Sequence, residues 1–374
     1  MNTNLIIALV AVLTTSACAL AGVFLVLRRM AMMADAISHA VLPGLVAGFV
    51  LAHMAKLERG GELLASFAGA VVAGLLTVFL VETLTKSRRV KEDAAIGVVF
   101  PALFALGVFV ISKYLANVHI DTDAVLFGEI AFTPFDTLVI GERDFGPQAL
   151  WTLGGLTLLN GGFLALFYKE LKLSTFDPGL AAALGFAPVL LHYTLMSMVA
   201  VTTVGAFNAV GAILAVALII VPPVTASLLT RRLPILILLS LIVGATGALL
   251  GLWLALRWNV SISGMIATMQ GVLFGTTLLL APEQGLVAQA VRRHKQRRRF
   301  AAETLVVHLA THEGTDSEGV ESERLHLHSD LLWTPDYANE AIVMARNAGW
   351  ITEHSGNLRL TDGGRERATE VATR

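Results

Sequence analysis

The sequence predicts an all-α polytopic membrane protein of about nine transmembrane helices, between eight and ten, followed by a small α+β domain outside the membrane. The chain of 374 residues is 55% hydrophobic and only 15% charged, with a mean hydropathy of +0.72. Soluble domains average about 25% charged residues. A helix needs about 20 apolar residues to cross a bilayer, and nine segments have this character: residues 5–27, 36–54, 63–84, 94–112, 149–168, 189–206, 207–228, 235–256 and 263–282.

Basic residues gather at alternate ends of these segments and predict the orientation of the chain. Loops rich in Lys and Arg stay in the cytoplasm. We therefore expect the N-terminus outside and the last domain in the cytoplasm, with the final basic run also close to anionic membrane lipid. The basic loops are residues 28–29, 86–91, 169–172, 231–232 and 292–299.

The last part of the chain differs from the rest in charge and pattern. Residues 1–300 carry 21 basic and 15 acidic side chains, whereas residues 301–374 carry 6 and 13. The tail shows a helix, a second helix, a two-stranded hairpin with its turn at 355–357, and a last short helix, a pattern typical of a winged helix. We expect a transmembrane domain over 1–290, a basic linker over 291–300 and a cytoplasmic domain over 301–374.

The acidic charge of this tail argues against DNA as its partner, because DNA affinity comes largely from Lys and Arg. The presumed recognition helix, residues 336–348, carries two acidic residues and one basic residue. A contact with another protein is the favoured use. Metal sensing is an alternative, because His308 and His312 share a helix face, and His326 and His328 share a strand-like face.

Two ionisable residues stand inside the second apolar segment. Asp35 and His39 are four residues apart, so a helix places both side chains on one face. Ionisable groups are costly in a bilayer and usually face a cavity or a partner. Carboxylate oxygen with imidazole nitrogen suits Zn(II), Mn(II) or Fe(II); a structural hydrogen bond and a proton relay are the alternatives. Pro43 and Gly44 follow in the same segment and predict a break in the helix near this pair.

Five stretches of the sequence, in chain order, resemble the permeases of metal-uptake ABC transporters of the zinc, manganese and iron class. They are GVFLVLRRMAMMADAISHAVLPGLVAGF at 22–49, KEDAAIGVVFPALFALGVFV at 91–110, LFGEI at 126–130, STFDPGLAAALGF at 174–186 and VGAILAVALIIVPPVTASLL at 210–229. The resemblance spans roughly residues 5–285. In the tail, GWITEHSGNLRLTDGGRERA at 349–368 resembles the end of the winged-helix domain in metal regulators of the diphtheria-toxin-repressor class.

The resemblance implies a transporter of the vitamin-B12-importer architectural type in a bacterial inner membrane. This chain would be the permease rather than an enzyme, with Mn, Zn or Fe as its cargo and no permanently bound cofactor. Its partners would be a second permease subunit, identical or a sister chain, a separate ABC ATPase and an extracytoplasmic metal-binding protein. The chain contains no GxxxxGK[ST] sequence for a P-loop, as expected where a partner binds ATP.

The resemblance also implies roles for particular residues. Asp35 and His39 become ligands of the ion in transit, and 174–186 becomes a coupling helix that fits a groove on the ATPase. Asp177 can cap this short helix, with Pro178 as its first residue and Gly185 as its stop. The expected coupling residues are Phe176, Asp177, Pro178, Ala182, Leu184 and Gly185, and weaker candidates for metal entry on the outer side are His119, Asp121 and Asp123.

Two other functions compete with the ATP-driven permease. One is a proton-coupled secondary metal transporter in which Asp35 and His39 form the relay. Secondary carriers often show internal repeats, and the sequence has no second segment like DAxSHA. The other is a membrane-anchored metal-responsive regulator, which the acidic tail disfavours. The ligand types alone do not select among the three metals.

Overall fold

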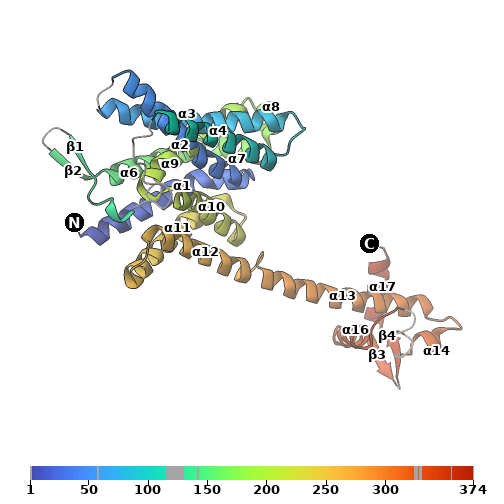
Figure 1. Cartoon of the computed structure of the whole chain (residues 1–374). Helices are drawn as coiled ribbons and strands as arrows, with labels where there is room; N and C mark the ends of the chain where they lie inside the picture. Colours follow the sequence, from blue (N-terminus) through green and yellow to red (C-terminus); the bar gives the residue numbers. More distant parts are fainter. Residues whose placement is uncertain are drawn as a thin grey trace. The chain divides into compact units, whose positions relative to one another are not determined.

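The computed structural model describes residues 2–56, 59–114, 130–140, 143–323, 327, 331–354 and 356–373 (Figure 1). The chain divides into two compact units, Met1–Ala281 and Pro282–Arg374. The division falls at residue 281, ahead of the boundary at 290 that the sequence suggested. Each unit is considered by itself below.

The first unit is a helix bundle whose long helices follow the predicted segments. Nine helices in the described part of the chain are long and apolar enough to cross a membrane, as predicted. The sixth and seventh are separated at Gly211, whose φ of 83° lies in the left-handed region, a few residues beyond the expected boundary. The nine are α1 (Thr3–Leu27), α2 (Ala31–Met54), α3 (Arg59–Lys86), α4 (Glu92–Tyr114), α6 (Gln148–Leu166), α9 (Pro188–Val210), α10 (Ala212–Leu229), α11 (Leu233–Trp258) and α12 (Ile262–Leu280).

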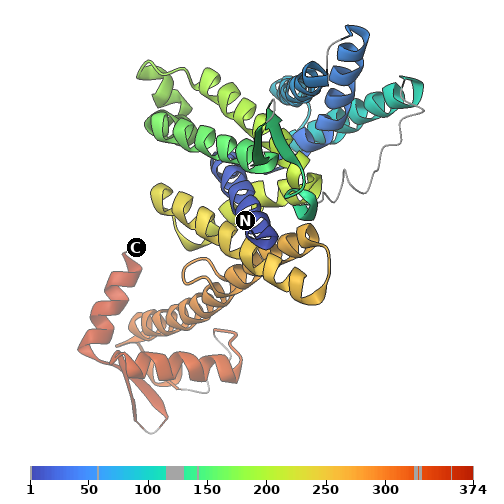
Figure 2. The same ribbon diagram turned by 90° about the vertical axis from the view of Figure 1, so that its left-hand side faces the viewer.

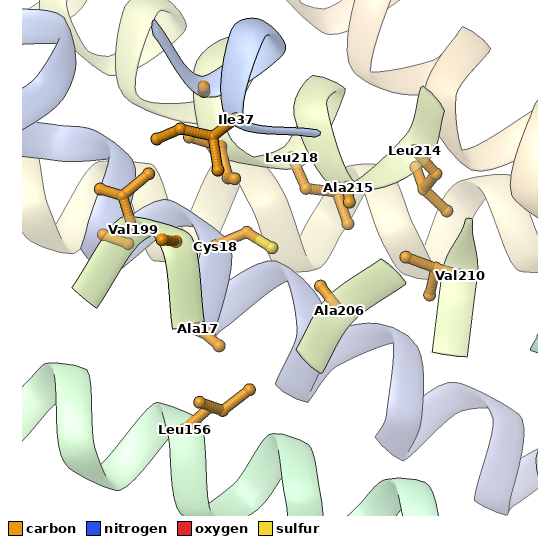
Figure 3. Close-up of a cluster of buried hydrophobic side chains, with 14 of the residues drawn as sticks. Ala17, Cys18, Ile37, Leu156, Val199, Ala206, Val210, Leu214, Ala215 and Leu218 are labelled. Atoms are coloured by element: carbon orange, nitrogen blue, oxygen red, sulfur yellow. The ribbon is translucent and has the colours of Figure 1, made fainter. Parts of the chain in front are cut away.

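Helix α1 lies among the other helices of this unit, as the view toward its N-terminal end shows (Figure 2). It packs against α6, α9, α10 and α11. Its buried side chains meet those of α2, α6, α9 and α10 in one apolar cluster (Figure 3). A Cβ added at Gly22 would lie 1.8 Å from the carbonyl oxygen of Ile219, so glycine allows α1 and α10 to approach backbone to backbone. Small residues commonly serve this purpose between membrane helices.

Three short elements precede α6 and were not expected from the sequence. They are the 3₁₀ helix η1 (Ile130–Phe132) and the antiparallel strands β1 (Thr137–Ile140) and β2 (Arg143–Pro147). The indole nitrogen of Trp151 donates to the carbonyl oxygen of Phe145 at 3.0 Å and ties this hairpin to the start of α6. Strands of four or five residues are too short for a clear alternating pattern.

The second unit is built around its own apolar core, to which α13 (Leu286–His312), α16 (Pro335–Asn347), β3 (Ile351–His354), β4 (Asn357–Leu360) and α17 (Asp362–Ala372) contribute. A short helix, α14 (Glu318–Glu321), follows α13. The predicted order of helix, helix, hairpin and helix is confirmed, and Gly356 in the hairpin turn has a φ of 87°. The assignment of these elements to the winged-helix class stays a prediction.

The stretch expected as a basic linker, residues 291–300, is part of a longer helix. They are helical and lie within α13, which begins at Leu286 rather than near residue 301. The reason is local: half of this stretch is Arg, with one Lys and one Gln, and all three are good helix formers. Neither Gly nor Pro interrupts α13 anywhere along its length.

Candidate functional site

Asp35 and His39 lie together on one face of α2. The Oδ1 atom of Asp35 is 3.6 Å from Nε2 of His39, and the two side chains are 37% and 40% exposed. Residues 36–38 between them are buried. The imidazole of His39 stacks on the ring of Phe100 in α4, with ring centroids 5.0 Å apart. The distance of 3.6 Å between these two atoms is beyond a normal hydrogen bond, and both side chains keep part of their surface exposed.

Ser38, Met32 and Met33 are the other potential ligands beside this pair. The hydroxyl of Ser38 donates to the carbonyl oxygen of Ala34 at 2.9 Å, within its own helix. Met33 is fully buried, and Met32 is exposed. Within the part of the chain that the structure describes, no third His, Cys, Asp or Glu joins Asp35 and His39 in a cluster of possible metal ligands. Among the described residues, Asp35 and His39 are thus the two carboxylate or imidazole ligands at this position.

The break predicted at Pro43 and Gly44 is not observed, because α2 continues through both residues. Close packing accounts for them instead. A Cβ added at Gly44 would lie 2.5 Å from the carbonyl oxygen of Gly69 in α3. A Cβ added at Gly107 in α4 would lie 2.4 Å from Cβ of Pro43. Both residues therefore let α3 and α4 approach the helix that carries Asp35 and His39.

The proposed outer-entry residues, His119, Asp121 and Asp123, lie outside the residues that the structure describes. Their role stays a prediction. The same holds for His326 and His328 in the second unit.

The predicted coupling segment, residues 174–186, comprises the end of α7 (Tyr168–Phe176) and the short helix α8 (Pro178–Ala183). The carboxylate of Asp177 accepts a hydrogen bond from the backbone N–H of Leu180 at 2.9 Å, as an N-cap does. Pro178 is the first helical residue, and Gly185 follows the helix with a φ of 86°. The predicted cap, start and stop of this helix are therefore confirmed.

The coupling segment exposes an apolar surface. Phe176 is 63% exposed, Leu180 47% and Leu184 61%, and Ala182 is also exposed. By contrast, Ala181 is buried and faces the rest of the unit. Exposed apolar side chains that gather on one element commonly mark a contact surface for another protein.

Arg28, at the end of α1, anchors the coupling segment, a role that the sequence did not suggest. Its Nε donates to the hydroxyl of Thr175 at 3.1 Å, and one terminal nitrogen donates to the hydroxyl of Ser174 at 3.0 Å. The other terminal nitrogen lies 3.0 Å from Nδ1 of His192 in α9. Burial lowers the pKa of the Arg28 guanidinium. These bonds join the end of α1 to α7 and to the start of α9.

His192 also links Arg28 to α3, because its two ring nitrogens bond Arg28 and Glu82. A guanidinium has only donors, so Nδ1 of His192 accepts from Arg28 and its Nε2 carries the proton. That Nε2 donates to the carboxylate of Glu82, which also accepts from the hydroxyl of Tyr193 at 2.9 Å and from Lys86 at 2.9 Å. Lys86 is four positions from Glu82, but His192 and Tyr193 are 110 and 111 positions away, so the sequence alone does not show that they meet.

Comparison with known proteins defines the class of this helix bundle. Residues 1–281 match the model of the ABC 3 transport family. The chain therefore belongs to the ABC 3 transport family, whose members are membrane permeases of ABC transporters. This membership favours the ATP-driven permease over the two alternatives that the sequence left open.

Particular relatives are similar over most of the chain. The zinc transport system membrane protein TroD of Treponema pallidum is 44% identical over 359 residues, which covers 95% of each chain. The manganese transport system membrane protein MntD of Bacillus subtilis is 46% identical over 281 residues, 75% of this chain and 93% of that protein. Among solved structures, PsaBC from Streptococcus pneumoniae in complex with Fab is similar, with a TM-score of 0.61 and 30% identity over 76% of this chain and 94% of that one.

Proposed function

We propose that this permease subunit of an ABC importer carries a divalent transition-metal ion past Asp35 and His39. The observation that supports the path is their geometry: a carboxylate oxygen and an imidazole nitrogen 3.6 Å apart, partly exposed, on a membrane-spanning helix. The names of the relatives favour Mn(II) or Zn(II) as the cargo, with Fe(II) as a third candidate of similar ligand preference. The chain is not an enzyme, and a separate ABC ATPase hydrolyses ATP.

A site with two ligands from one chain suits transit. A transported ion must bind well enough to enter and weakly enough to leave. Four protein ligands that close around zinc hold it as a structural ion. Water or the second permease subunit, a copy or a sister chain, would complete the coordination around Asp35 and His39.

The coupling segment is the proposed contact with the ATPase. Its capped helix exposes Phe176, Leu180 and Leu184, and its α7 end is bonded to Arg28. Arg28 lies three residues before the start of α2, and α2 carries Asp35 and His39. A displacement of α8 by the ATPase would therefore reach the helix that holds the ion through a short, hydrogen-bonded connection.

The same bonds support the proposed orientation. The contacts of Arg28 and Glu82 bring the basic loops 28–29, 86–91 and 169–172 to one end of the first unit. By the positive-inside rule this end faces the cytoplasm of a bacterial cell, and the N-terminus lies outside. An extracytoplasmic metal-binding protein would deliver the ion at the outer end. The second unit would then be a cytoplasmic, winged-helix-like domain that contacts protein rather than DNA.

Elemental analysis of metal-starved cells tests the proposed path. The cells would express the chain with its ATPase and its binding protein, at equal membrane abundance for each variant. We expect wild type to accumulate one metal and His39→Ala to fall to the level of cells without the permease, because an imidazole ligand is lost.

Ser38→Ala is the matched control, since the Ser38 hydroxyl is hydrogen-bonded within α2 and the side chain is buried, unlike those of Asp35 and His39. It should accumulate metal like wild type. Normal uptake by His39→Ala would place the path elsewhere, and equal loss in both variants would indicate damage to α2 rather than loss of a ligand.

A further inference from the structure

Three potential metal ligands meet in the second unit, far along the sequence from Asp35 and His39. His308 and His312 lie one helical turn apart on α13, and Glu321 is the last residue of α14, which packs beside α13 (Figure 1). One ligand atom from each of the three lies within 4.8 Å of the other two. Nε2 of His308 is 3.5 Å from a carboxylate oxygen of Glu321, and the two imidazole rings are centred 4.9 Å apart.

We propose that His308, His312 and Glu321 form a binding site for a divalent transition-metal ion. Two imidazole nitrogens and one carboxylate oxygen suit Zn(II), Mn(II) or Fe(II). Ligands about 2.1 Å from a tetrahedral zinc ion lie about 3.4 Å from one another. The separation of His308 and Glu321 is close to this value, and the ligand atom of His312 lies within 4.8 Å of both, so binding would draw the three side chains closer together.

The surroundings orient these ligands. The hydroxyl of Ser317 lies 3.4 Å from Nδ1 of His312 and can accept its proton, which leaves Nε2 for the metal. Histidine ligands commonly have such a partner on the second ring nitrogen. Gly314, with a φ of 75°, turns the chain after α13, and its N–H donates to the Glu318 carboxylate at 2.7 Å. This turn returns the chain so that Glu321 reaches the two histidines.

Charge and access also suit a cation. A cavity of about 310 Å³ is lined by His312 and Glu321 and gives a route to the site. Its lining carries three carboxylates and two guanidinium groups, an excess of one negative charge. One of these guanidinium groups, that of Arg365, is already paired with Glu313 and Asp362. His308 and Glu321 are only 11% and 15% exposed, so a bound ion would be partly desolvated.

Three protein ligands leave a coordination position for water. Sites of this kind exchange metal more readily than closed sites of four ligands. The bound ion would join α14 to α13, so metal availability would control how firmly this part of the second unit is ordered. The site is therefore of the type that responds to a metal level rather than one that holds a permanent structural ion.

Titration of the purified full-length chain with Co(II) tests the site, because Co(II) bound to nitrogen and oxygen ligands absorbs visible light. The background variant would carry Asp35→Asn and His39→Gln, so that ions on the proposed transport path do not contribute and the result does not depend on that path. We expect this background to bind one Co(II) with a visible band. His312→Gln and Glu321→Gln should each weaken that binding at least tenfold, as losses at metal sites do.

His294→Gln is the matched control, since His294 is exposed on the same helix and lies outside the cluster. It should leave the band unchanged. His312 is half-buried, and Glu321→Gln keeps the size of the side chain, so the melting temperatures of both variants measured in EDTA should stay at the background value. Absence of the Co(II) band in the background, or an equal loss in His294→Gln, would overturn the proposal.

Discussion

At the scale of single residues, the side chain of Arg28 connects three helices of the first unit. Its guanidinium is removed from most of the solvent, which is costly for a charge unless hydrogen bonds replace the water. Ser174, Thr175 and His192 provide those bonds from three directions. Only arginine presents donors in a planar fork that can meet three acceptors at once. The residue therefore holds α1, α7 and α9 in one fixed arrangement beside the coupling segment.

Replacing Arg28 should weaken coupling rather than metal binding. A hydrogen bond to a charged group contributes about 1.5–3 kcal/mol. Loss of one such bond therefore changes the equilibrium constant that depends on it by about tenfold or more. We expect Arg28→Gln to lower metal transported per ATP hydrolysed about tenfold in proteoliposomes with the ATPase and binding protein. Arg28→Lys keeps the charge but not the planar fork of donors. Its ratio of metal transported to ATP hydrolysed should lie between those of wild type and Arg28→Gln.

Arg29→Gln is the control for this prediction, because Arg29 is adjacent, equally charged and exposed. It should keep the wild-type ratio of transport to hydrolysis. If Arg28→Gln also kept that ratio, the connection through Ser174 and Thr175 would be structural only.

At the scale of elements, α8 illustrates a helix that depends on its ends. Six residues make too few internal hydrogen bonds to hold a helix in isolation. Asp177 satisfies an N–H at the start, Pro178 fixes the first turn, and Gly185 takes the left-handed conformation that ends it. The caps thereby keep Leu180 and Leu184 on a defined surface.

Loss of the cap should therefore weaken the contact with the ATPase. Replacing an N-cap Asp by Ala costs about 0.5–2 kcal/mol. We expect Asp177→Ala to reduce the amount of ATPase that co-purifies with the permease in detergent. Asp177→Asn retains a capping oxygen and should keep the complex; equal loss in both variants would mean that the charge of Asp177, and not the cap, makes the contact.

At the scale of the whole molecule, the two units have separate cores and are not shared equally among the relatives. The match to MntD covers 75% of this chain, about the length of the first unit, whereas the match to TroD covers 95% and so extends into the second. The family match also ends at residue 281. The membrane unit is thus common to these proteins, and the second unit is an addition present in some of them.

Deletion of residues 282–374 should leave transport in place. The nine candidate spans, the Asp35–His39 pair and the coupling segment all lie before residue 281. We expect the shortened chain to insert, retain the ATPase and accumulate metal in starved cells, while losing the Co(II) site of the second unit. A shortened chain that inserts normally but imports nothing would show that the second unit is required for transport.

The sequence alone predicted the features that depend on neighbouring residues. The lengths of the apolar runs determine the nine helices, and Asp177, Pro178 and Gly185 mark the ends of α8 because caps act within one turn. The pairing of Asp35 with His39 followed from a spacing of four residues on a helix. The basic stretch 291–300, expected as a linker, is helical in the structure, in keeping with its composition.

Only the tertiary structure decided the contacts between distant segments. It joined Glu321 to His308 and His312, and it joined Arg28 to Thr175, which is 147 positions away. It also showed that Pro43 packs against α4 instead of breaking α2. Local signals arise from interactions within a few residues and are visible in any sequence. Contacts across the fold depend on how whole helices pack. The sequence around one residue of such a contact does not indicate which distant residue it meets.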